Sequence, residues 1–153
     1  MPRTLRSYGL REGEFSVVVE GLSDLLRDLR AIDKAIPREV RRELVKVAKP
    51  LAVRAGSLAP RGTRRLQKGR RQRLGGSLRP ATRGDRVVIR SPLPYAKIVH
   101  WGGRRPADTR NREKWIAIAG RPFVAKALDG MQREIFDDLA DAVDGVLARH
   151  GFN

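Results

Sequence analysis

The sequence contains no cysteine, only two histidines in 153 residues, and few aromatic residues, which make up 5%. Without cysteine the chain can form no disulfide, use no thiol nucleophile and build no cysteine-bound zinc site. Its N-terminal residues lack the apolar core of a signal peptide, and no apolar run approaches the length that spans a bilayer. We therefore expect a soluble chain with no membrane partner.

Motifs for catalysis and for metal or nucleotide binding are also missing. His100 and His150 do not form a metal-binding spacing, and a structural zinc site normally needs four ligands. No Walker A loop is present, and no GxGxxG follows a predicted strand. The reference pKa of histidine would suit His100 as a general base, but no placed nucleophile accompanies it. We predict that the chain is not an enzyme, that His100 is a half-buried residue closing an element, and that no cofactor, metal or catalytic residue is present.

The positive charge is unevenly distributed. The formal net charge is +16 at pH 7. Residues 1–22 are neutral, residues 23–60 carry +4, residues 61–121 carry +15, and residues 122–153 carry −3. A basic middle and an acidic end indicate pairing within the chain, pairing between subunits, or an anionic partner.

Hydrophobic periodicity predicts long helices at both ends of the chain. Ser23 is a suitable N-cap for a helix whose apolar stripe runs from Leu22 to Ile36. Pro37 suits the first turn of a second helix reaching residue 59, which Pro50 should bend. Pro122 opens a regular apolar stripe that predicts a helix over 122–149, with acidic residues on its opposite side.

Short strands and two basic loops are predicted between the helices. Residues 13–22 and 85–91 favour strands, with Gly84-Asp85 as a turn, and "WIAIAG" at 115–120 is a third strand. "YAKIVHWG" at 95–102 fits a strand or a short helix equally well. Residues 61–83 and 102–114 are predicted to be extended mobile loops, because they contain too few apolar residues to offset their ordering entropy. The fold class is therefore α+β, with a small antiparallel sheet and a single domain over 1–153.

Nucleic-acid binding is the main alternative to pairing between subunits as a role for the basic segment. Clustered arginines are the usual electrostatic footprint of phosphate binding. No aromatic residue lies between 61 and 94, so base stacking has no platform there, and any contact with DNA should be independent of sequence. The same arginines could instead pair with acidic residues of neighbouring subunits. Ribosome-dependent messenger-RNA interferases are also small basic domains with a lone histidine, but they are shorter, and the long acidic C-terminal helix does not suit them.

Four segments, taken in order, resemble a known family. They are "LAP" at 58–60, "GGSLRPA" at 75–81 followed by the strand "RVVIRS", "YAKIVHWGG" at 95–103, and "RPFVAKALDG" at 121–130. This order is similar to that of the neck and tail-completion proteins of long-tailed bacteriophages, which are also described as head–tail joining or minor tail proteins. The similarity covers about residues 40–150. His100 stands where that family usually has glutamate, Gly103 stands where threonine is common, and the serine of "GGSLRPA" is shifted.

The resemblance implies a non-enzymatic structural protein of the virion, made in the host cytoplasm and located at the head–tail junction. Such proteins form rings, commonly of six or twelve subunits, which join the portal to the tail tube and let DNA pass. The implied partners are further copies of the chain, neighbouring connector, portal-side and tail-tube proteins, and packaged DNA. We expect subunit contacts at Tyr95, Trp101, Trp115 and Phe123. Contacts with DNA or an acidic partner are expected at Arg61, Arg64, Arg65, Lys68, Arg70, Arg71 and Arg73.

Overall fold

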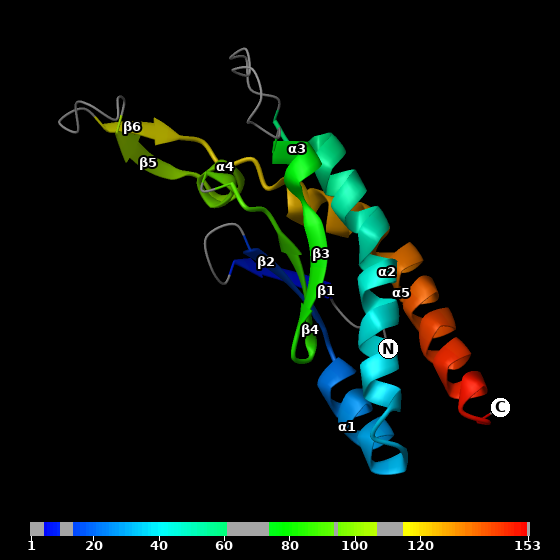
Figure 1. Cartoon of the computed structure of the whole chain (residues 1–153). Coiled ribbons are helices and arrows are strands. Elements are labelled where there is room, and N and C mark those ends of the chain that lie inside the picture. Colours follow the sequence, from blue (N-terminus) through cyan, green and yellow to red (C-terminus); the bar gives the residue numbers. More distant parts are fainter. Residues whose placement is uncertain (1–4, 10–13, 61–73, 94, 107–114, 153) are drawn as a thin grey trace.

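Five helices, two of them long, a four-stranded sheet and a separate two-stranded sheet make up the described part of the chain (Figure 1). The computed structural model describes residues 5–9, 14–60, 74–93, 95–106 and 115–152. The architecture is α+β, as predicted. The elements, in chain order, are β1 Leu5–Gly9, β2 Glu14–Val19, α1 Leu22–Ile32, α2 Ile36–Leu58, α3 Leu74–Ser77, β3 Arg79–Arg83, β4 Arg86–Arg90, α4 Ala96–Trp101, β5 Gly103–Pro106, β6 Trp115–Ile118 and α5 Phe123–Arg149.

Helices α2 and α5 lie side by side and antiparallel, and their contact is the most extensive between any two elements (Figure 1). Pro37 occupies the first turn of α2, where a missing N–H costs little. The helix continues through Pro50, whose side chain is exposed, so that water can bind the carbonyl group that the proline leaves unpaired. One continuous helix was predicted here and is confirmed, whereas its bend at Pro50 stays a prediction.

The four-stranded sheet is antiparallel, with strand order β1-β2-β4-β3. Phe15 and Val17 of β2 alternate onto the face that packs against the helices, as the sequence pattern predicted. The β3–β4 hairpin pairs Arg83 with Arg86 and turns at Gly84-Asp85, where Gly84 adopts a positive φ of 58°. The predicted turn and both predicted strands of this sheet, β2 and β4, are therefore present.

One hydrophobic core lies between this sheet and the two long helices. The buried side chains of α2 face those of α5 across it, and Phe15 and Ile89 close it from the sheet. The exposed faces of the helices carry the charged residues. None of the described helices has the length and apolar character needed to cross a membrane.

The two predicted basic loops are shorter than expected, which corrects part of the sequence-based assignment. Residues 74–83 form α3 and β3, and residues 103–106 form β5. Strand pairing supplies the reason: β3 and β5 satisfy their backbone groups against β4 and β6, so their side chains need not enter a core. The remainder of the predicted loops, residues 61–73 and 107–114, lies outside the described residues.

The start of α1 also differs from the prediction. Gly21 adopts a left-handed conformation with φ of 80°, so α1 begins at Leu22, and no side chain caps it. Ser23 therefore lies inside the first turn rather than at the N-cap. Ile36, which was placed on the stripe of this helix, instead begins α2, because the chain turns at Asp33, whose carboxylate accepts the N–H of Ala35 at 2.8 Å.

Substitutions in α2 should separate core packing from surface helix propensity. Leu51 is 1% exposed between α2 and the rest of the core, whereas Val53 is 74% exposed on the same helix. Leu51→Ala should lower the free energy of unfolding by about 2–5 kcal/mol because it leaves a cavity. Val53→Ala, the matched control, should change it by less than about 0.5 kcal/mol. Urea denaturation measures both, and equal effects would contradict the assigned core.

Candidate functional site: assembly surfaces and a cationic cleft

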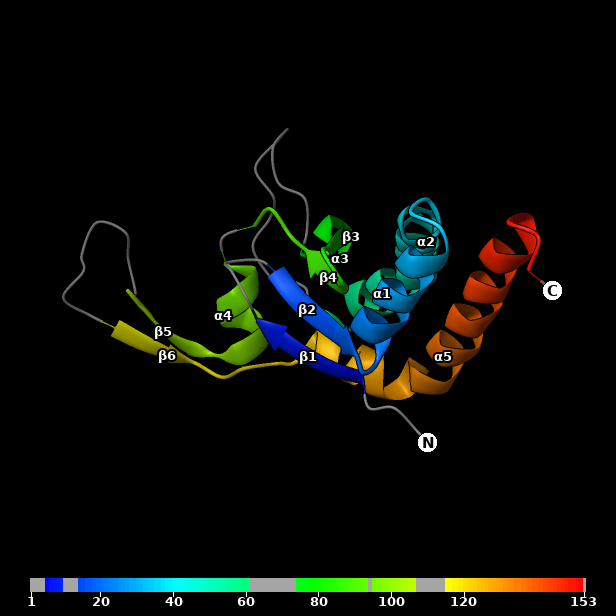
Figure 2. The same ribbon diagram turned by 90° about the horizontal axis from the view of Figure 1, so that it is seen from below.

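The segment that follows the four-stranded sheet forms a module that projects from the body of the protein. We call residues 95–106 and 115–121 the projecting module. It contains α4 and the β5–β6 hairpin, which belongs to its own two-stranded sheet. Figures 1 and 2 both show this hairpin extending away from α1 and from the C-terminal half of α5. The open choice between strand and helix for "YAKIVHWG" is settled as the helix α4.

Large apolar side chains on the projecting module face solvent. Tyr95 is 44% exposed, Trp101 45%, Trp115 52% and Ile116 40%. Trp115 and Ile116 are adjacent in β6 and so lie on opposite faces of the hairpin. Three of the four residues predicted to contact another subunit are therefore exposed on this one module.

Two glycines fix the base of the projecting module. Gly102, with φ of 81°, lies so close to Gly120 that an added Cβ would meet its nitrogen at 2.7 Å. A Cβ on Gly120 would meet the carbonyl carbon of Trp101 at 2.6 Å. Next to this close approach of the two glycines, the N–H of Arg121 donates a hydrogen bond to the carbonyl oxygen of Val99 at 2.9 Å. The entry and exit of the hairpin are thus held together without any side chain between them.

Phe123 is a core residue rather than an exposed contact residue, which corrects its predicted place at a subunit interface. It is 1% exposed and packs edge-on against Phe15, with ring centroids 5.7 Å apart. It stands at the start of α5, where the apolar stripe of the helix enters the core. The aromatic ring of Phe123, which suggested a subunit contact, packs in the core of the protomer instead.

His100 is buried more deeply than expected. It is 1% exposed, and its ring lies 4.5 Å from that of Phe15 and 5.0 Å from that of Phe123 between centroids. Neither ring nitrogen has a hydrogen-bond partner among the described residues. Burial lowers the pKa of His100 to about 4, because the charged imidazolium is poorly solvated there. The imidazole is therefore neutral at pH 7 and acts as an aromatic packing group between the sheet and α5.

Ser91, which directly follows β4, forms hydrogen bonds that hold the local fold. Its hydroxyl lies 2.7 Å from that of Ser77, which also donates to the carbonyl of Leu74 at 2.7 Å. The Ser91 hydroxyl accepts the N–H of Leu93 at 3.2 Å. These bonds connect α3 to the end of β4 and engage both hydroxyl groups.

An open apolar groove lies between α1 and the middle of α5. We call it the α1–α5 groove, and its volume is about 630 Å³. Leu22 and Leu25 form one wall, and Phe136 with Leu139 forms the other. Asp144 lies at its edge. The residues that line it are Val19, Leu22, Leu25, Gln132, Arg133, Phe136, Leu139, Ala140, Val143 and Asp144.

Helix α5 presents an acidic surface next to this groove. Its six carboxylates are all exposed, and none forms an ion pair with a residue in the described ranges. This agrees with the predicted acidic face of the last helix. The six are Asp129, Glu134, Asp137, Asp138, Asp141 and Asp144.

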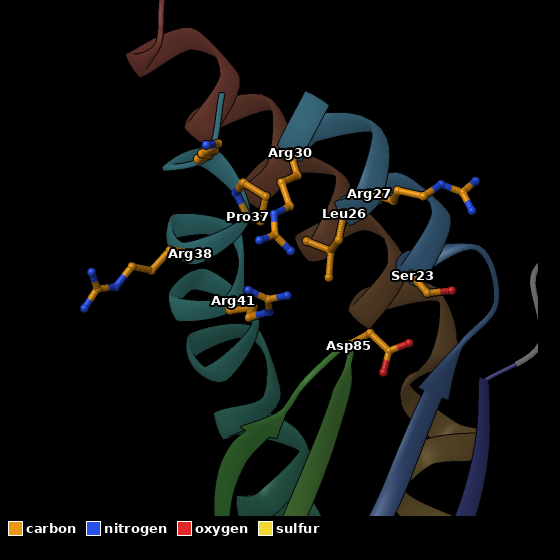
Figure 3. Close-up of a pocket in the computed structure, with 9 residues that line it drawn as sticks. Ser23, Leu26, Arg27, Arg30, Pro37, Arg38, Arg41 and Asp85 are labelled. Atoms are coloured by element: carbon orange, nitrogen blue, oxygen red, sulfur yellow. The ribbon is translucent and has the colours of Figure 1, made fainter. Parts of the chain in front are cut away.

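A cationic cleft of about 420 Å³ lies between α1, α2 and the β3–β4 turn. Figure 3 shows Arg30 of α1 and Arg41 of α2 pointing toward one another across it, while Arg27 and Arg38 point outward at its edges. Arg41 is held in place because its Nε donates to the carbonyl of Gly84 at 2.8 Å. Arg30 and Arg38 form no ion pair with any residue that the structure describes. Converging guanidinium groups repel one another unless an anion lies between them, so the cleft is suited to a phosphate or carboxylate.

The sequence did not predict this cleft. Its basic residues come from two helices and are separated by acids and apolar residues, so no charge run marks them. The only signal was the +4 net charge of residues 23–60. The predicted contact arginines Arg61, Arg64, Arg65, Arg70, Arg71 and Arg73, together with Lys68, lie outside the described residues.

Part of the positive charge of the middle segment is used within the protomer. Glu14 of β2 is 6% exposed, and its Oε1 lies 2.6 Å from Arg83 Nη2 and 3.7 Å from Arg90 Nε. This cluster joins β2 to β4 and β3. Arg86 also lies 4.0 Å from Asp85, so internal pairing, one of the three alternatives for the basic segment, accounts for at least three of its arginines.

The burial of His100 predicts a specific pH dependence of stability. Its pKa is about 4 in the folded protein and about 6.5 in the unfolded chain, so the unfolded chain binds a proton first as the pH falls. This residue should leave stability unaffected above pH 6.5 and cost about 2 kcal/mol by pH 5.

His100→Leu removes the titrating group and its unpaired nitrogens while keeping an apolar side chain. Urea unfolding at pH 7.5 and pH 5 should show that the variant loses about 2 kcal/mol less than wild type between these values. An identical loss in both proteins would show that His100 is accessible to protons in the folded state.

No group of three or more potential metal ligands occurs among the described residues. The exposed aromatic residues, the apolar groove and the cationic cleft lie in three different parts of the molecule. Comparison with protein-family models, with curated proteins and with solved structures found no match to this chain.

Proposed function

We propose that the protein is a structural virion subunit of the head–tail connector of a long-tailed phage. It assembles into a ring that joins the portal side to the tail tube and lets DNA pass. The order of sequence motifs supports the family, and the exposed aromatic residues of the projecting module support the assembly. No chemical step is assigned to any residue.

The exposed apolar side chains of the projecting module are the main structural support for this proposal. A two-stranded hairpin is at best marginally stable in water. Here both faces of such a hairpin expose a large apolar side chain, Trp115 on one and Ile116 on the other. A neighbouring subunit that covers the hairpin would remove this apolar surface from water and stabilise both the hairpin and the assembly. Aromatic side chains are also the residues that most often dominate binding energy at protein interfaces.

The charge distribution is compatible with the same role. A ring repeats each side chain once per subunit, so basic groups that face its lumen sum to a strong field around the passing DNA. The contact requires no base recognition, since a connector must accept any sequence.

Removing the exposed tryptophans should disrupt assembly without unfolding the protein. Light scattering after size exclusion should give wild type a mass that is a multiple of 17.2 kDa, and negative-stain images should show rings. Trp101→Ala/Trp115→Ala should elute as the monomer, since each truncation removes a central interface contact worth about 2 kcal/mol. Phe152→Ala, which truncates an aromatic residue 45% exposed outside the module, is the matched control. A wild-type protein that remains a monomer at every concentration contradicts the ring.

The cationic cleft favours a second candidate function, sequence-independent binding of nucleic acid. Arg30 and Arg38 line it, without partners in the described part of the chain. Arg30→Ala/Arg38→Ala should weaken binding to duplex DNA and lower the slope of log K against log salt by about 1–2. Lys49→Ala/Arg54→Ala removes two exposed charges of α2 outside the cleft and should have a smaller effect. Fluorescence anisotropy across a salt series measures both, and equal weakening would rule out the cleft.

Particle assembly distinguishes the two functions. The variant Arg64→Ala/Arg65→Ala/Arg70→Ala/Arg71→Ala is tested for binding to DNA and for incorporation into virions. Loss of DNA binding with intact assembly would favour the nucleic-acid-binding protein. Loss of incorporation would favour the connector.

A further inference from the structure

We infer that the projecting module of one copy docks in the α1–α5 groove of the next copy, an assignment that rests on the proposed ring. The two surfaces would then be the two unlike halves of one repeated interface. Such a head-to-tail contact closes into a ring when the rotation between subunits permits it.

The apolar surfaces of the two partners match in kind. The groove is lined by leucine, valine and phenylalanine side chains and has a volume of about 630 Å³, enough for several side chains. The hairpin offers Trp115 and Ile116, which are 52% and 40% exposed. Covering both surfaces removes apolar area from water on each side of the contact.

The charges of the two partners are opposite. The projecting module contains Lys97, Arg104, Arg105 and Arg121 and no acidic residue. Helix α5 has six exposed carboxylates without ion-pair partners among the described residues, and Asp144 lies at the groove itself. Opposite charges around an apolar centre orient an approaching partner and exclude like-charged ones.

The geometry requires two copies. The module leaves the body beside the start of α5, whereas the groove lies between α1 and the middle of α5 (Figures 1 and 2). The close approach of Gly102 and Gly120 joins the two ends of the hairpin, which extends away from α1 and from the C-terminal half of α5 (Figures 1 and 2). The hairpin therefore cannot fill the groove of its own chain, and the contact joins two subunits.

Two variants that each remove one half of the interface test this pairing. The module variant is Trp115→Asp/Ile116→Asp, which makes the hairpin acidic and polar. The groove variant is Ala140→Arg/Asp144→Arg, which changes two exposed positions of α5 to repel the basic module. Each variant alone should be a monomer, with self-association weakened about 100-fold or more. Circular dichroism and thermal unfolding verify that both remain folded.

The mixture of the two variants gives the decisive measurement. The module variant keeps an intact groove and the groove variant keeps an intact module, so one interface remains possible. An equimolar mixture should form a heterodimer with twice the mass of one chain and nothing larger. A control variant, Gly130→Arg/Ala148→Arg, adds two arginines at exposed positions of α5 outside the groove, leaves all six carboxylates in place, and should assemble as wild type does.

Other outcomes overturn the inference. If wild type forms rings and both single variants also do, the docking is wrong and the ring stands. The same holds if the mixture remains monomeric. Leu5 pairs with Val19, which lines the groove. If a variant that lacks residues 1–4 loses assembly as the groove variant does, the chain's own N-terminus covers the groove and the docking is wrong. A monomeric wild type contradicts both the docking and the ring.

Discussion

The packing of α2 against α5 is the constraint on which the other features depend. The two helices run antiparallel, so the end of α2 lies beside the start of α5 (Figure 1). All of the chain between them must leave and return at that end. The β3–β4 hairpin lies back along the helices and completes the sheet, whereas α4 and the β5–β6 hairpin extend outward. The projecting module and the α1–α5 groove are therefore separated by the pairing of the two long helices.

In this arrangement acidic and basic side chains lie on different parts of the protomer. Helix α5 uses one face for the core, and its six carboxylates are exposed and form no ion pair with a described residue. Arg83 and Arg90 neutralise Glu14 inside the sheet, while Lys97, Arg104 and Arg121 of the projecting module form no ion pair with a residue that the structure describes. The protomer therefore has a basic, aromatic extension and, on α5, an acidic face next to an apolar groove, so that two of its surfaces carry opposite charge.

Buried aromatic packing explains why His100 and Phe123 serve structure. Both rings meet Phe15 where the sheet, α4 and the start of α5 converge. His100 is neutral there because burial disfavours its charge, and its aromatic ring fills space that a charged side chain could not. The projecting module is anchored to the body through this cluster, so a residue that looked like a catalytic base contributes to the placement of the exposed tryptophans.

The sequence by itself determined the long helices, strands β2, β4 and β6, the turn at Gly84-Asp85 and the uneven charge, because periodicity and turn chemistry are local properties. It also singled out Tyr95, Trp101, Trp115 and Phe123 as candidate contact residues. It did not show that the first three are exposed and that Phe123 is buried. Only the tertiary structure decided that β3 and β5 form from basic residues, because β3 is held by pairing with β4 and by contact with α2, and β5 by pairing with β6. It alone brought Arg30 and Arg41 together from two helices, and Leu25 and Phe136 into one groove. Such sites depend on how elements pack, and no short stretch of sequence encodes that arrangement.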